Sequence, residues 1–559
     1  MDNPRLYLWI ALALLGWMNV VQWNRDYGAP APAATTAAAP SGAAASGATG
    51  TAQLPSVPTG QGAPASAAAA PAVAAPTATA ATSPRVRVVT DVLDLDISLQ
   101  GGDLVRADLL KYPRDKQEGS PPVRLFDTEE PNFYVLRSGL RALDGRAEPT
   151  HLALYTSTAD EYRMAPGQEL RVPITWTDGQ GVTVTKTYVF KPGSYDVGLH
   201  YDVDNRSDTA WSGASYVQIA RHIFQQKRSM FDVESYAFRG PAIYDGKSYR
   251  RLDVEDEDDA KLSESVTDGW VASLQHHFVS AAVPPKAEAY QVTLGKDGDH
   301  SLLTARGPLK AVPAGTTGQF SETLFVGPKL QEQLKVTGPK LERVVDYGKL
   351  TILAEPLFWL MEQVHRFVGN WGWTIIIVTF LLKLLFYKLT ETSGRSMAKM
   401  RTIAPRIKSI QERYKDDREQ LAKQMMEIYK REKINPVAGC LPILVQIPVF
   451  LAFYWVLLES VEMRQAPWML WIQDLSSKDP FFILPILMGV AMYGQFKLNP
   501  APPDPMQAKI FAFMPVIMTV MMAWFPAGLV LYWLTNTLLS IAQQWKINKV
   551  VEAESKKGS

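Results

Sequence analysis

Lys383 stands within the apolar run Trp373–Tyr387 (WTIIIVTFLLKLLFY), which contains no acidic residue. A lysine near the centre of a membrane helix costs about 2.5–3.5 kcal/mol. Thr379 precedes it by four residues and would share its face of a helix. An ammonium and a hydroxyl on one face can bind polar or anionic groups if water reaches them. Alternatively, the Lys383 side chain extends to the membrane surface, about 6 Å away at 1.5 Å per residue.

Polar side chains also interrupt other apolar runs of the C-terminal half. If their faces converge with those of Thr379 and Lys383, they line a hydrated groove instead of a dry core. The alternative is routine hydrogen bonding between helices. The further candidates for this groove are Gln446, Trp524, Tyr532, Trp533 and Asn536.

The chain shows no sign of an enzyme. It has no GxxxxGK[ST] phosphate-binding loop and no nucleophile–base arrangement, so an ATP-driven pump or a membrane hydrolase is not supported. We expect no catalytic residue and no cofactor. His276-His277 is the nearest hint of a metal site, but without cysteine or a second spaced histidine a strand-edge pair is favoured, and no metal is predicted.

The bulk composition sets further limits. Cys440 is the only cysteine, which excludes an intramolecular disulfide. A net charge of +1 over 559 residues gives no indication of a specific nucleic-acid site. The spans show no obvious inverted duplication, which weakens a secondary transporter.

The N-terminal elements differ sharply in composition. Residues 1–24 contain an apolar, Trp-rich run preceded by Arg5, which predicts a transmembrane anchor; a cleaved signal peptide is the alternative. Residues 25–84 are almost entirely Ala, Pro, Ser, Thr and Gly, which predicts a disordered tether.

Residues 85–340 alternate between apolar and polar side chains, as in VTVTKTYVF (182–190), with turn signals such as Gly101-Gly102 between runs. This pattern predicts an all-β sandwich of antiparallel sheets. Residues 341–358 carry an apolar stripe that predicts an amphipathic helix lying on the membrane and ended by Pro356. An ordinary linker helix is the alternative.

Residues 359–548 predict a five-helix core. With the anchor, the chain would be a polytopic α-helical membrane protein with six transmembrane helices. The connection 390–435 carries twelve basic and seven acidic residues, so the positive-inside rule places it in the cytoplasm. The β domain then lies outside, and the N terminus and the tail 549–559 lie in the cytoplasm. The predicted spans are 359–389, 436–461, 481–498, 509–525 and 527–548.

Within 390–435, apolar residues recur at helical spacing on both sides of a polar turn, which predicts a cytoplasmic helical hairpin. Its basic, methionine-bearing surface is a candidate contact for an apolar nascent segment or the ribosome. A solvated hairpin held by its own seam is the alternative. The candidate contact residues are Met397, Met400, Arg401, Arg406 and Met425.

Five motifs between about Pro356 and Lys546 resemble the YidC family of bacterial membrane-protein insertases. The anchor, tether and β domain are similar to the Gram-negative form of that family, in which the β domain is a periplasmic sandwich. The motifs are Asn435–Pro448 (NPVAGCLPILVQIP), Arg464–Pro467 (RQAP), Leu470–Leu475 (LWIQDL), Asp504–Met506 (DPM) and Phe525–Tyr532 (FPAGLVLY).

The resemblance implies an inner-membrane insertase and chaperone that acts alone or with the Sec translocon and its accessory subunits. Its other partners would be nascent inner-membrane proteins, the ribosome and the lipid bilayer. Lys383 matches the cationic groove position of that family, where arginine is common, and Thr379 and Gln446 match groove-facing positions. Trp533 falls on the last span, along which substrates pass.

Two other functions stay open from the residues alone. One is a polytopic transporter or channel for a small polar solute. The other is a scaffold that holds partner membrane proteins through the β domain.

Overall fold

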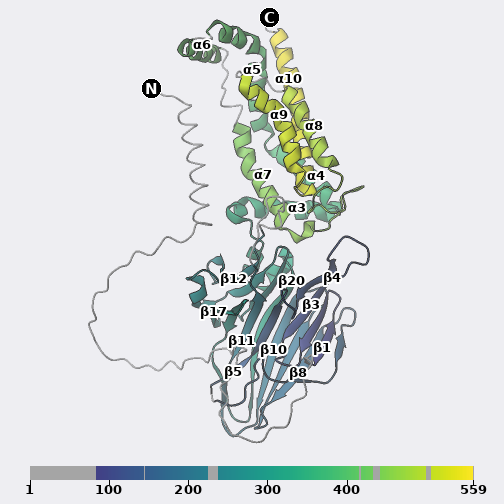
Figure 1. Ribbon diagram of the computed structural model, residues 1–559, viewed down its shortest axis with the longest axis vertical. Helices are drawn as coiled ribbons and strands as arrows, with labels where there is room; N and C mark the ends of the chain where they lie inside the picture. The colour runs from purple at the N-terminus through teal and green to yellow at the C-terminus, as the bar shows by residue number, and fades with distance from the viewer. Residues whose placement is uncertain are drawn as a thin grey trace, which may run out of the picture. The chain divides into compact units, whose positions relative to one another are not determined.

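The computed structural model describes residues 84–143, 145–224, 237–414, 417–431, 441–498 and 505–557 (Figure 1). The anchor predicted over 1–24 and the tether predicted over 25–84, except Pro84, lie outside the described residues. The described residues all belong to one compact unit.

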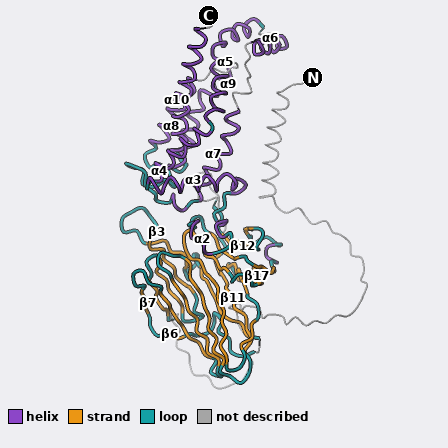
Figure 2. The backbone as a smooth tube through the Cα atoms, turned by 180° about the vertical axis from the view of Figure 1, so that it is seen from behind, coloured by secondary structure: helices purple, strands orange, loops and turns teal. Residues whose placement is uncertain are grey.

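The first part of the described chain is the predicted β-sandwich, built from two sheets (Figure 2). The pairings are antiparallel, except that β1 and β7 are parallel. The 11-stranded sheet contains, in spatial order, β14 (Ser263–Thr267), β17 (Ala289–Asp297), β18 (His300–Arg306), β11 (Trp211–His222), β5 (Tyr134–Ala142), β3 (Leu104–Pro113), β2 (Leu93–Ser98), β1 (Arg85–Val89) and β7 (Glu161–Arg163), with β19 (Lys310–Val312) on β11 and β4 (Pro122–Phe126) on β3. The 9-stranded sheet contains β13 (Tyr249–Arg251), β12 (Gly240–Tyr244), β15 (Trp270–Leu274), β16 (Phe278–Val283), β20 (Thr316–Pro328), β10 (Asp196–Asn205), β9 (Val182–Phe190), β8 (Leu170–Thr177) and β6 (Thr156–Ser157).

The alternation in the sequence determines which side chains form the core between the sheets. Along β9, Val182, Val184, Lys186 and Tyr188 are all fully buried, whereas the residues between them are partly exposed. Successive strand residues face opposite sides, so one register places this whole set inside. The confirmed sandwich therefore follows from the pattern, with one exception: a lysine occupies a core position.

Lys186 joins the two sheets through its ammonium. Its Nζ donates to the carbonyls of Gly101 (3.0 Å) and Gly102 (2.8 Å), in the turn between β2 and β3, and of Ser138 (3.0 Å) on β5. Burial lowers the pKa of Lys186 to about 8, and burial raises the pKa of nearby Asp103 to about 7 against the opposing effect of Lys186. A side chain at Gly102 (φ +62°) would collide with Ile174 and crowd Lys186, so the close approach requires glycine.

The continuous helix predicted over 341–358 is not observed. The chain forms α2 (Gln331–Thr337), then two 3-10 turns, η3 (Leu341–Val344) and η4 (Gly348–Leu350), before α3 (Thr351–Val368). Val345 is extended and Gly348 has φ +61°, so helical geometry cannot persist through the stripe. Pro356 lies inside α3 instead of ending it, because a proline near the start of a helix removes a single ladder hydrogen bond. A further 3-10 turn, η2 (Asp259–Lys261), lies within the β domain.

The first predicted core span, 359–389, is broken in the structure. Gly369 (φ +66°) ends α3, and Asn370 starts α4 (Trp371–Leu385) by accepting a hydrogen bond from the Trp373 N–H (3.2 Å). The chain bends again at Phe386, where α5 (Tyr387–Arg413) follows. Hydropathy does not reveal these breaks, because the capping residues interrupt an otherwise apolar run only briefly.

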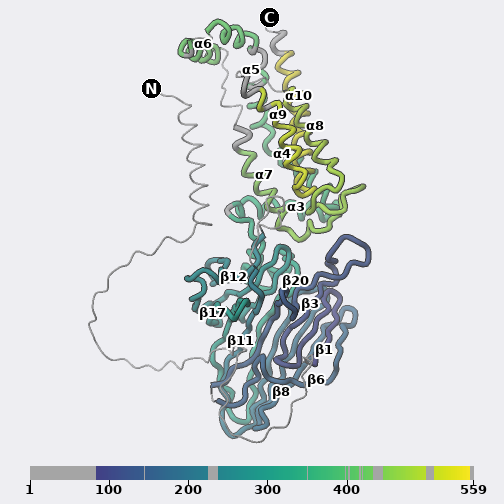
Figure 3. Tube along the Cα trace, viewed as in Figure 1, coloured from purple at the N-terminus to yellow at the C-terminus, as the bar shows by residue number. Residues whose placement is uncertain are grey.

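The other helices fall close to the predicted runs. They are α6 (Arg418–Arg431), α7 (Leu441–Glu459), α8 (Ile483–Leu498), α9 (Pro505–Met522) and α10 (Ala527–Lys557). In Figure 3, α8 packs against α9 and α10, and α10 also contacts α4, α5 and α7.

In the part of the chain that is described, no single helix is both long and apolar enough to cross a bilayer, whereas α4 and Tyr387–Met400 meet that criterion together across a 65° bend.

Because Lys186 joins the two sheets, we expect its substitution to lower the stability of the β domain. Lys186→Met keeps most of the length of the side chain but removes the ammonium donor from three buried carbonyls, of which that of Gly102 keeps a second donor, the Tyr188 hydroxyl. We expect a loss of about 3–5 kcal/mol in the free energy of unfolding of the β domain, as for breaking other buried charge networks. Hydrogen exchange of the β9 amides in the full chain measures this loss. Lys191→Met, at an exposed lysine just after β9, is the matched control, and an equal loss in both variants would contradict the assigned role of Lys186.

Candidate functional site

Lys383 connects α4 to α10. Its Nζ donates to the Ser540 hydroxyl (2.8 Å), and that hydroxyl donates to the Asn536 carbonyl one turn earlier (2.7 Å). The Lys383 side chain is half-buried, and no carboxylate pairs with it among the residues that the structure describes. An ammonium has three N–H donors, and Ser540 is its one acceptor in the described part of the chain. The Lys383 amine therefore bonds to α10 through one N–H. This leaves it unused donor capacity, because its other N–H groups have no acceptor among the described residues.

The polar surface of α10 extends toward the start of α5. Gln543 Nε2 donates to Thr390 Oγ1 (2.9 Å) and approaches the Tyr387 carbonyl (3.4 Å). Asn536, Ser540 and Gln543 are spaced i, i+4, i+7, so they form one stripe along the helix. Asn536 was among the predicted groove residues, whereas Ser540 and Gln543 were not, although their spacing in an otherwise apolar run could have revealed them.

Thr379 lies on the predicted face but does not bond to Lys383. Its hydroxyl donates to the Ile375 carbonyl of its own helix (2.6 Å), and its side chain is buried. This bond satisfies the hydroxyl without a partner helix. Thr379 is therefore close to Lys383 along α4 but makes no bond to it. The residue that contacts the Lys383 amine directly is Ser540 on α10.

Tyr532 and Trp533 belong to an aromatic cluster between α7 and α10. Tyr532 stacks on Phe453 with ring centroids 4.3 Å apart, and Trp533 meets Phe450 edge-on at 4.6 Å. Gln446 lies one turn before Phe450 on α7 and is half-buried. These predicted groove residues thus converge on the α7–α10 boundary.

Trp524 is separated from that group. It lies between α9 and α10 and is exposed. Ser540 is 13 residues into α10 from Ala527, about 20 Å along the axis at 1.5 Å per residue. The structure therefore does not bring Trp524 together with Lys383.

The N-terminal end of α4 is fixed by the loop that follows α7. The Asn370 amide donates to the carbonyls of Pro467 (3.2 Å) and Trp468 (3.0 Å). The Trp468 indole occupies the space where a Cβ at Gly372 would stand, so only glycine allows this approach. These contacts therefore hold α4, and with it Lys383, at a fixed position relative to this loop.

The hairpin has the predicted helical seam. Ile403 and Ile407 on α5 are buried against Met425, Ile428 and Tyr429 on α6, with Met400 beside them. Arg406 is exposed. The side chains of Met397 and Arg401 lie outside the described residues.

His276 and His277 are not at a strand edge. They lie in the turn between β15 and β16, buried, with rings stacked at 3.9 Å. His276 Nε2 lies 3.0 Å from the Leu458 carbonyl, and burial lowers the pKa of His276 to about 3. The pair is a neutral packing element around neutral pH.

Comparison with known proteins identifies the family. The family model described as 60Kd inner membrane protein matches residues 363–555, and the one described as YidC periplasmic domain matches residues 85–360. A membrane protein insertase YidC of Thioalkalivibrio sulfidiphilus is 48% identical over 570 residues, covering 100% of both chains. The chain belongs to the YidC family of membrane protein insertases.

Other YidC insertases are also similar to this chain. One from Pseudomonas putida (strain W619) is 46% identical over 565 residues, again covering 100% of both chains. A crystal structure of an active YidC insertase with its first transmembrane domain resolved aligns with 83% of this chain and 92% of its own, at 19% identity and a TM-score of 0.39. The matching family models are those of an inner membrane protein and of a periplasmic domain, and the transporter alternative is not favoured.

The Lys383–Ser540 contact can be measured by a double-mutant cycle. We expect Lys383→Met and Ser540→Ala to be coupled by about 1 kcal/mol, within the range of interhelical hydrogen bonds in membranes. Reversible unfolding of the full chain in mixed micelles gives the coupling energy. Thr392→Ala replaces Ser540→Ala in a control cycle, because the Thr392 hydroxyl bonds within α5. Equal coupling in both cycles would contradict the contact.

Proposed function

We propose that the chain inserts membrane proteins into the inner membrane and that Lys383 receives hydrophilic parts of the substrate. The observation that supports this proposal is the unused donor capacity of the Lys383 ammonium beside the polar stripe of α10. A structural lysine would have its donors satisfied by the protein itself. An incompletely satisfied one can exchange water for the polar or acidic groups of a passing chain.

The proposed mechanism needs a hydrophilic groove that is open to cytoplasm and lipid and closed outside. Water in the groove shortens the low-dielectric barrier that a polar tail must cross. Meanwhile the apolar segment of the substrate enters lipid along the outer helices of the core. Burial contributes about 0.8 kcal/mol for each CH₂ group, so the hydrophobicity of the substrate itself can drive insertion.

The proposed topology has six transmembrane helices and both termini in the cytoplasm. Its organisation is an anchor, a tether, a periplasmic sandwich, an interfacial segment, a five-helix core and a cytoplasmic tail. The exposed apolar side chains of α3 support the interfacial assignment: Ile352 is 83% exposed, Trp359 59% and Phe367 90%. Side chains of this kind favour the acyl–headgroup boundary over water.

The proposed partners follow from the same arrangement. Nascent inner-membrane proteins would contact Lys383 and Trp533, and lipid would surround the core. The basic hairpin formed by α5 and α6 would meet the ribosome or the emerging chain. The Sec translocon and its accessory subunits are further proposed partners. The chain would act without catalytic residues, cofactor or specific nucleic-acid site.

Charge substitutions at Lys383 test this function. Lys383→Arg should insert substrates normally, whereas Lys383→Glu should slow a substrate with an acidic tail at least about tenfold. Like charges about 4 Å apart repel by about 4 kcal/mol at an effective dielectric of about 20, and 1.4 kcal/mol corresponds to a factor of ten. The assay is protease protection of ribosome-bound nascent chains inserted into liposomes that contain only this protein.

Two controls sharpen the assay. Lys497→Glu introduces the same charge change at an exposed lysine near the end of α8 and should leave insertion unchanged. A substrate whose tail acids are replaced by Asn and Gln should be rescued from the Lys383→Glu defect. Normal insertion of every substrate by both Lys383→Glu and Lys383→Ala would refute the proposed role of the charge.

Photocrosslinking tests the route independently. A photoreactive residue at position 383 or 533 should capture arrested nascent chains in both apolar and polar segments. Capture of mature partner proteins alone would favour a scaffold and would count against insertion through this site.

A further inference from the structure

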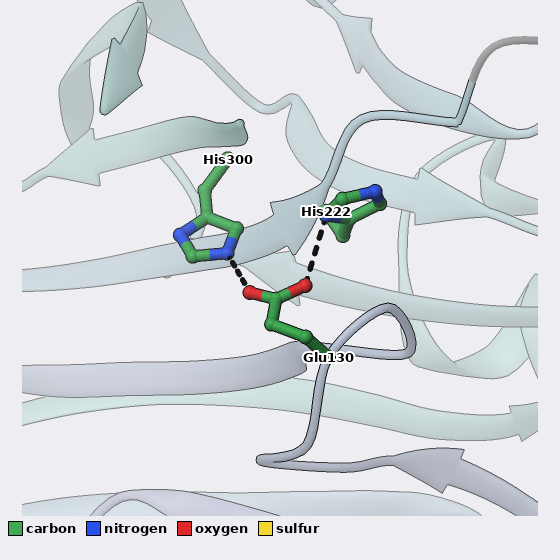
Figure 4. Close-up of side chains that lie close together, drawn as sticks. All are labelled: Glu130, His222 and His300. Carbon is green, nitrogen blue, oxygen red and sulfur yellow. Dashed lines mark hydrogen bonds and ion pairs between the residues drawn. The ribbon is translucent and has the colours of Figure 1, made fainter. Parts of the chain in front are cut away.

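Three side chains from separate parts of the 11-stranded sheet converge in Figure 4. His222 ends β11 and His300 begins β18, and the two residues are paired directly in the antiparallel register. Glu130 lies in the loop between β4 and β5. Its Oε2 is 3.0 Å from His222 Nδ1 and its Oε1 is 2.5 Å from His300 Nε2. One ligand atom of each residue lies within 4.8 Å of the other two.

Phe133 orients both histidines. Its carbonyl accepts a hydrogen bond from the His222 backbone N–H (2.8 Å), and its ring stacks on the His300 ring with centroids 4.3 Å apart. Phe224 packs edge-on against His222 at 5.6 Å. Ligands that are held before a cation arrives lose little freedom when they bind it.

One ligand atom is also buried without an aligned partner. His222 Nδ1 makes no hydrogen bond among the described residues, although Glu130 Oε2 is close enough for an ion pair. A buried nitrogen in this condition costs free energy. A cation placed between the imidazole and the carboxylate would satisfy both groups.

We propose that Glu130, His222 and His300 form a Zn²⁺ site on the periplasmic domain. Imidazole nitrogens and a carboxylate oxygen are ligands of zinc, at about 2.0–2.2 Å. Ligand atoms at the corners of such a tetrahedron are about 3.4 Å apart. The present separations, all within 4.8 Å, therefore need to change by at most about 1.4 Å. Three protein ligands leave one position for water.

His222 also borders a cavity of about 360 Å³, lined in addition by Phe224 and Ser301. This cavity gives water and a cation a route to the site. Once bound, Zn²⁺ joins the loop before β5 to the ends of β11 and β18, in addition to the backbone pairing, the Glu130 ion pairs and the Phe133 contacts already present there. The site therefore acts as a cross-link at one end of the sheet, separate from the insertion chemistry of the helices.

Zinc titration of the full chain tests the proposal. The protein is purified in detergent without a histidine tag, stripped with a chelator, and titrated with Zn²⁺ against a chromophoric competitor. We expect one Zn²⁺ per chain, with the affinity lowered more than about tenfold in Glu130→Gln and in His300→Ala. His200→Ala removes an exposed histidine of β10, in the other sheet, and should leave the affinity unchanged.

Cobalt gives a second readout that does not depend on affinity. Co²⁺ should produce d–d absorption in the wild-type chain, and Glu130→Gln should lose it. Thermal unfolding in chelator shows whether each variant is folded, and His300→Gln serves if His300→Ala is not. The proposal is overturned if wild type and ligand variants bind Zn²⁺ equally, or if wild type binds none. In either case Glu130 and the two histidines are an ion-pair cluster only.

Discussion

An ammonium removed from bulk water needs acceptors for its three N–H donors, and this requirement gives Lys186 and Lys383 different roles. In the β-sandwich, Lys186 has an acceptor for every donor, supplied by carbonyls of both the turn after β2 and strand β5. The result is a fixed link between two sheets. On α4, Lys383 has one acceptor among the described residues, the Ser540 hydroxyl. The same chemical group is structural in one place and available for binding in the other.

The sequence predicted the sandwich well, because alternation is a local property that survives folding. The register of β9 follows from its own residues, including the unexpected inward position of Lys186. The helical half was predicted less well. The run 359–389 appears continuous in hydropathy, yet Gly369 and Asn370 end one helix and begin the next. The capping signals were present in the sequence and were outweighed by the apolar residues around them.

In the candidate site, too, local features of the sequence were predictable and contacts between distant segments were not. Lys383 was identifiable because a charge in an apolar run is a local anomaly, but its partner Ser540 lies 157 residues away and depends on how α4 packs on α10. His276 and His277 attracted attention by adjacency and proved to be buried packing residues. His222 and His300 attracted none, because only the pairing of β11 with β18 brings them together. Contacts set by tertiary register cannot be derived from spacing along one chain.

The attachment of α4 has a mechanical consequence. Its N-terminal end is bonded through Asn370 to the Pro467 and Trp468 carbonyls, and Gly372 packs against the Trp468 indole. Its other end is followed by the 65° bend before α5, and the start of α5 is bonded to α10 through Gln543 and Thr390. A rod held at both ends bends less than one held at a single end. Lys383 is therefore kept close to α10 by more than its own hydrogen bond to Ser540.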